Sequence, residues 1–257
     1  MRKPKVIVLS GYGLNCEEET KFAFDIAGAK TDIVHINDLI DKTYSLKNYQ
    51  VIAIPGGFSY GDDTGSGNAY ALKLKNHLWE DILNFIEKDT LVIGICNGFQ
   101  ILVRLGIFAN VALTHNTKPR YLNRWVDLEI TNDSPWLSRI DKLSLPIAHG
   151  EGRFYASKQV LDKLTTKKMI ALEYVKGEMC QYQNLQANPN GSMRNIAGIT
   201  DETGRILGLM PHPERGMFFS QRPDFPLLKE KYLRERRKLP ETVDGIKIFQ
   251  NAVNYFR

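Results

Sequence analysis

Hydrophobic residues in the first half of the chain form short runs separated by segments in which they recur every three or four positions. Four of these runs are predicted to form buried strands: residues 5–10, 31–36, 50–55 and 90–95. Three segments with helical spacing follow them, one from about Glu17, one carrying Leu74, Leu78, Ile82 and Phe85, and one ending near Leu105. Alternating strands and helices with nearly continuous apolar strands predict a parallel sheet covered by helices on both faces.

The second half has a different pattern, with more strand-like runs and fewer helical segments. Five runs are predicted to form strands: residues 125–131, 145–148, 170–175, 196–200 and 206–211. A last helix is predicted over about residues 244–256. We expect an antiparallel or mixed extension of the same sheet. Because the chain contains no internal repeat and no linker, residues 1–257 are predicted to form a single α/β domain.

The composition is typical of a globular protein, with 43% hydrophobic and 25% charged residues. The apolar run near the start, Val6 to Leu9, is too short for a signal peptide, and no run approaches the roughly 18 residues of a membrane span. The three cysteines, Cys16, Cys96 and Cys180, form no Cys-x-x-Cys pair. We therefore expect a cytoplasmic protein with neither a disulfide framework nor a metal site.

The net charge of +5 is concentrated in one segment. Residues 229–238 contain six basic and two acidic side chains, a local charge of +4, so the rest of the chain is nearly neutral. This distribution argues against nucleic-acid binding and favours a solvated helix face, with a partner-docking surface as the alternative.

The clearest chemical signal is the sequence GICNGFQ around Cys96. Cys96 directly follows a predicted buried strand and precedes a predicted helix, with Gly94 and Gly98 on either side, which is the pattern of a Gly-x-nucleophile-x-Gly turn. The positive end of the helix dipole favours the thiolate, and the N–H of Asn97 is expected to point toward a developing oxyanion. The alternative for this turn alone is a structural buried cysteine.

Two further segments supply possible partners for a cysteine nucleophile. In RILGLMPHPER, His212 and Glu214 are two positions apart at the end of a predicted strand, so an extended backbone would place both side chains on the same side. His212 could then act as the base, and Glu214 as the acceptor that orients it. In IAIPGGFSYGDD, two adjacent glycines permit an unusual backbone, and the N–H of Gly57 is predicted to be the second oxyanion donor. Each of these segments alone is weak evidence.

Nucleotide-binding motifs are not found. Residues 11–16 lack the last glycine of a dinucleotide fingerprint, and no phosphate-binding loop ends in Gly-Lys-Ser/Thr. This chain therefore has no evident means of activating a substrate with ATP.

Together, GICNGFQ and PHPE resemble the class I, or triad, glutamine amidotransferases. Four blocks more narrowly resemble the glutaminase subunit of phosphoribosylformylglycinamidine synthase: PGGFSYGD, GICNGFQIL, PIAHGEGRF and NPNGS…NIAGI…LGLMPHPER. This resemblance covers nearly the whole chain and implies a flavodoxin-like core. The sequence departs from the family pattern after Asp62 and in the long segment between Arg215 and Asp244.

The resemblance implies a role for each matching residue. Cys96 would attack the glutamine side-chain amide, His212 would transfer protons, Glu214 would orient His212, and Gln100 would help to hold the substrate. The resemblance assigns no chemistry to His149 or Glu151, which a structural turn explains equally well. It also implies a large synthetase subunit that binds ATP and Mg²⁺, a small bridging subunit, and no cofactor in this chain.

The implied reaction converts formylglycinamide ribonucleotide to its amidine in purine biosynthesis with ammonia from glutamine. The first alternative is a class I glutaminase that serves another acceptor, and the second is a regulatory relative without activity. A thiol peptidase fits less well, because Gln100 and Glu214 match the amidotransferase pattern.

Overall fold

The computed structural model describes residues 3–257. Its main feature is a nine-stranded sheet in the order β2-β1-β3-β4-β11-β10-β9-β6-β7. The strands are β1 (Lys5–Ser10), β2 (Lys30–His35), β3 (Val51–Ile54), β4 (Leu91–Ile95), β6 (Leu122–Ile130), β7 (Lys142–His149), β9 (Ile170–Val175), β10 (Ile196–Thr200) and β11 (Ile206–Leu209). A separate two-stranded sheet pairs β5 (Val111–His115) with β8 (Glu151–Ala156).

The sheet changes from parallel to antiparallel at β11. Strands β2, β1, β3, β4 and β11 are parallel, whereas β10, β9, β6 and β7 pair antiparallel. The predicted α/β fold with a parallel core and a mixed extension is therefore confirmed. Strands β5 and β8 were not predicted, and β11 was predicted without its parallel pairing to β4.

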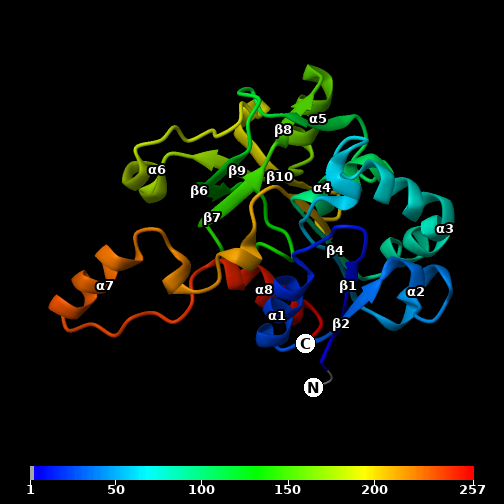
Figure 1. Ribbon diagram of the computed structural model, residues 1–257, viewed down its shortest axis with the longest axis horizontal. Coiled ribbons are helices and arrows are strands. Elements are labelled where there is room, and N and C mark those ends of the chain that lie inside the picture. The colour runs from blue at the N-terminus through cyan, green and yellow to red at the C-terminus, as the bar shows by residue number, and fades with distance from the viewer. Residues whose placement is uncertain (1–2) are drawn as a thin grey trace.

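Helices cover both faces of the parallel part (Figure 1). They are α1 (Glu17–Ala27), α2 (Ile36–Ile40), α3 (Asn68–Ile86), α4 (Asn97–Leu105), α5 (Lys158–Thr166), α6 (Glu178–Gln183), α7 (Phe225–Arg234) and α8 (Gly245–Tyr255). Helices α1 and α8 pack together, with the rings of Phe24 and Phe249 edge to face at 4.9 Å, worth about 1 kcal/mol beyond their burial.

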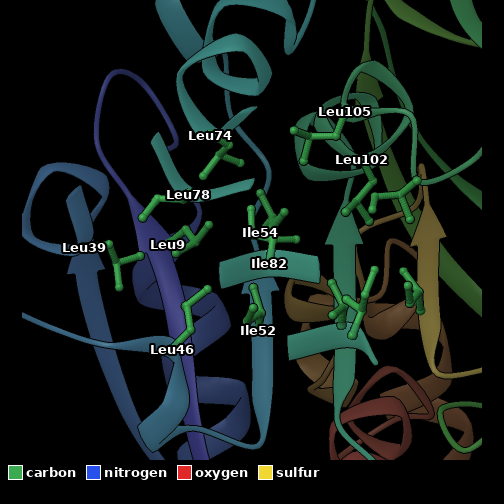
Figure 2. A pocket seen from close by; sticks show the side chains of 14 residues that line it. Leu9, Leu39, Leu46, Ile52, Ile54, Leu74, Leu78, Ile82, Leu102 and Leu105 are labelled. Atoms are coloured by element: carbon green, nitrogen blue, oxygen red, sulfur yellow. The ribbon is translucent and has the colours of Figure 1, made fainter. Parts of the chain in front are cut away.

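Helices α3 and α4 pack on the opposite face of the sheet from α1 and α8. Leu74, Leu78 and Ile82 of α3 point toward the aliphatic side chains of β1 and β3, as Figure 2 shows. These residues enclose a cavity of about 20 Å³ lined only by aliphatic side chains. A void of this character stays dry, because a water molecule there would find no hydrogen-bond partner. The apolar stripe predicted from residue 74 onward is thus confirmed as a core-facing surface.

Helix α7 lies apart from the rest of the molecule (Figure 1). None of its residues is buried, and Leu227 is 63% exposed. The basic residues at 229–238 are exposed, as expected for a solvated segment, although the helix ends at Arg234. Among residues 3–257, no helix has the length and apolar character needed to cross a membrane.

Candidate active site

The turn between β4 and α4 places Cys96 at the carboxyl end of the parallel sheet. Cys96 has φ 50° and ψ −104°, an unfavourable conformation for a residue with a side chain, and it is 4% exposed. A Cβ on Gly94 would lie 2.6 Å from the Gly98 carbonyl oxygen, and one on Gly98 would lie 1.9 Å from that of Ile54. Both glycines are therefore required for this tight turn, as the Gly-x-Cys-x-Gly pattern predicts.

His212 and Glu214 form a buried pair next to this turn. Nδ1 of His212 donates to Oε1 of Glu214 at 2.5 Å, and the two residues are 2% and 1% exposed. The predicted pairing is correct, but the predicted extended backbone is wrong. The strand ends at Leu209, and Glu214 lies in a 3-10 turn that begins at Pro213. The two side chains meet across this turn, because Pro213 starts it directly after the extended His212.

Electrostatic interactions favour a protonated His212. Burial by itself opposes the charge, but the Glu214 carboxylate and the Cys96 sulfur raise the pKa of His212 well above its usual value. Nε2 of His212 makes no hydrogen bond to any residue within 3–257. The imidazole is therefore held by Glu214 on one side and has a free nitrogen on the other.

The glycine loop after β3 also lies at this site, and Gly57 lines the same cavity as Cys96. Phe58 donates its N–H to the carbonyl of Gly13 at 2.8 Å, and the carbonyl of Gly56 accepts the N–H of Cys16 at 3.1 Å. Because successive N–H groups of an extended chain alternate in direction, the N–H of Gly57 points away from this neighbouring loop. Gly57 has φ 153°, which favours glycine.

Both predicted oxyanion donors are available. Within the described chain, the main-chain N–H groups of Gly57 and Asn97 donate to no carbonyl in a turn, loop or cap. The side chain of Asn97 ties the glycine loop to α4, because Oδ1 accepts the N–H of Ser59 at 3.1 Å and Nδ2 donates to Asp62 at 3.2 Å. This link gives Asn97 a positioning contact that the sequence did not reveal.

Gln100 lines the cavity, but both ends of its side-chain amide are engaged. Oε1 accepts from Nδ2 of Asn97 at 2.8 Å, and Nε2 donates to the carbonyl of Glu151. The structure therefore places Gln100 where its predicted contact with substrate is possible, and it adds a contact that holds the start of β8. His149 ends β7 and Glu151 begins β8, so the suggested turn is present, although both residues also line the cavity.

Cys16 and Arg215 lie next to the His212–Glu214 pair but were not predicted from the sequence to be site residues. Cys16 is 1% exposed and lies beside His212 and Glu214. The Cys16 sulfur, a ring nitrogen of His212 and a carboxylate oxygen of Glu214 are all within 4.8 Å of one another. A guanidinium nitrogen of Arg215 donates to the Cys16 sulfur at 2.9 Å. This positive charge disfavours a divalent metal ion beside the sulfur, so we interpret the cluster as a support for the His212–Glu214 pair. Only the fold brings Cys16 to this position, and no spacing pattern marks it.

Comparisons with known proteins identify the family of this chain. Residues 3–256 match the family of the CobB/CobQ-like glutamine amidotransferase domain. The phosphoribosylformylglycinamidine synthase subunit PurQ of Methanococcus maripaludis strain C5 is 49% identical over 98% of each chain. The PurQ subunit of Dehalococcoides mccartyi is 41% identical over 100% of this chain and 99% of its own.

A solved structure extends the agreement to the fold. A chain of the PurLQS structure from Thermotoga maritima superposes with a TM-score of 0.75 at 30% identity, with 100% of both chains covered. A second glutamine amidotransferase from the same organism, 15% identical with a TM-score of 0.53, supports the fold alone. The chain therefore belongs to the family of glutamine amidotransferase subunits of phosphoribosylformylglycinamidine synthase.

Proposed function

We propose that this chain hydrolyses glutamine through a thioester on Cys96 and supplies the ammonia to a synthetase. The observation that carries the proposal is the buried His212–Glu214 pair beside a cysteine held in a strained strand–helix turn. A raised His212 pKa favours an imidazolium at this position. A positive charge beside a cysteine is the arrangement that activates a cysteine nucleophile.

The proposed reaction has two halves. The Cys96 thiolate attacks the side-chain amide carbon of glutamine, and the N–H groups of Gly57 and Asn97 stabilise the oxyanion. His212 gives its proton to the leaving nitrogen, so that ammonia departs and a glutamyl thioester remains. His212 then takes a proton from water, which attacks the thioester and releases glutamate. Glu214 holds the imidazole and its charge throughout.

The proposed acceptor is formylglycinamide ribonucleotide, converted to its amidine on a large synthetase subunit that binds ATP and Mg²⁺. A small bridging subunit would complete the complex in the cytoplasm, and this chain would need no cofactor of its own. The names of the relatives and the PurLQS structure support this acceptor over another class I synthase.

The test is amidine formation by the large and small subunits with ATP, with and without this chain, on glutamine and on ammonium. We expect glutamine to support turnover only when the chain is present. Cys96→Ser should abolish the glutamine reaction and leave the ammonium reaction intact. Equal loss with both nitrogen donors would show that Cys96 is structural. If ammonium works and the chain adds nothing with glutamine, the acceptor is wrong.

A further inference from the structure

The cavity beside Cys96 has an unbalanced set of polar groups. Its volume is about 210 Å³, and the carboxylates of Asp62 and Glu151 both line it. No lysine or arginine of the described chain lines it, and His115, one of the two histidines that do, is 79% exposed. Two carboxylates therefore line one small cavity whose own lining contains no lysine or arginine to balance them.

Each carboxylate is held in place by the protein. Asp62 accepts from Nδ2 of Asn97 at 3.2 Å, and Glu151 accepts the N–H of Ser66 at 3.4 Å and lies 3.6 Å from Nδ1 of His115. Burial raises the pKa of Asp62, and the negative charge of Glu151 raises it further. The two carboxylates thus repel each other, and a cation between them would relieve the repulsion.

His149, which lines the same cavity, has one ring nitrogen that can act as a third acceptor. The side-chain N–H₂ of Asn116 donates to the carbonyls of Arg120 and His149, so its oxygen must face Nδ1 of His149, 3.1 Å away. Burial and the charge of His212 lower the pKa of His149 to about 3, so the ring is neutral. Nδ1 carries its proton, and Nε2 is an acceptor. This atom has no partner within residues 3–257, although the residue is only 2% exposed.

We propose that Asp62 and Glu151, with Nε2 of His149, bind the α-ammonium group of glutamine. An ammonium group has three N–H donors and one positive charge, which match three acceptors and an excess of negative charge. The α-carboxylate of glutamine would be repelled by Asp62 and Glu151 and would therefore point away from them. This inference rests on the proposed glutaminase function and names the groups that select its substrate.

The test compares glutamine with 4-carbamoylbutanoate, which is glutamine without its α-amino group. Hydrolysis of both would be measured as kcat/KM in the complex with the synthetase subunits. The variants are Asp62→Asn, Glu151→Gln and the double variant. The control is Asp63→Asn, which makes the same charge change on an exposed neighbour that does not line the cavity.

We expect each single variant to raise KM for glutamine roughly 10- to 100-fold, with a smaller change in kcat, because each loses one charge-assisted hydrogen bond. The double variant should hydrolyse glutamine no better than the analogue, whereas wild type and the control keep the preference. An equal loss for both substrates would overturn the inference, because it would indicate a structural role for the carboxylates. No change in any variant would also overturn it. A wild-type complex that fails to hydrolyse glutamine would instead refute the proposed function, and this inference with it.

Discussion

His149 is expected to make the protein less stable in mild acid. Its pKa is lowered to about 3 by burial and by the charge of His212, whereas a histidine in the unfolded chain has a pKa of 6.5. Between these two values the unfolded chain binds a proton that the native protein does not. The free energy of unfolding therefore falls as the pH drops below about 6.5, and the loss is complete near pH 3.

The size of this effect follows from the two pKa values. One pKa unit corresponds to about 1.4 kcal/mol, so at pH 5 the loss is about 2 kcal/mol, and over the whole window it is about 5 kcal/mol. A loss of about 2 kcal/mol is large compared with the roughly 5–15 kcal/mol that stabilise a typical domain. His212 has a raised pKa, so its own stabilising contribution is fully present below pH 6.5 and stays constant over this window.

The assay is urea unfolding of the wild type and His149→Gln at pH 8 and pH 5. A glutamine can still donate to Asn116 but does not titrate, so the variant should lose about 2 kcal/mol less than the wild type on acidification. His77→Gln is the matched control, because His77 is exposed on α3 and should leave the pH dependence unchanged. Identical losses in wild type and His149→Gln would refute the assignment of a neutral buried imidazole.

Two further predictions concern the groups around His212. Glu214→Gln removes a buried charge that pairs with the imidazolium. For charge centres about 4 Å apart and an effective dielectric constant of about 20, this attraction is about 4 kcal/mol, so the glutamine-dependent kcat should fall about 10³-fold while the ammonium-dependent reaction persists. A fall of less than tenfold in glutamate release would contradict this role. Cys16→Ala removes the sulfur that binds Arg215 beside the pair, and we expect roughly tenfold lower kcat, an altered pH profile and an unchanged KM for glutamine. Cys180→Ala, at another buried thiol, should change none of these, and an unaltered pH profile in Cys16→Ala would mean that Cys16 serves packing alone.

The sequence predicted the parts of the fold whose signals are local. The strand before Cys96, its two glycines and the following helix are contiguous, so their geometry follows from sterics and apolar spacing. The strands β5 and β8 were missed because each is only partly buried. The predicted solvated helix face at residues 229–238 overlaps α7, but the start of this helix at Phe225 was not predicted, because it buries no residue.

Contacts between segments that are distant in the sequence could not be predicted from it. Cys16 follows β1, and Arg215 follows β11, so only the packing of these loops brings the sulfur and the guanidinium together. The neutral state of His149 depends in the same way on burial and on His212. The exact backbone of His212 and Glu214 was predicted wrongly because a 3-10 turn, not an extended strand, joins them.

The position of β11 has a consequence for how the chain is synthesised. This strand is near the end of the sequence but lies inside the sheet, between β4 and β10. A growing chain that has emerged only as far as α4 already contains the Cys96 turn, but β4 still has an open edge and His212 has not been made. Cys96 is therefore synthesised before its proposed base His212, so we expect incomplete or truncated chains to be unable to hydrolyse glutamine.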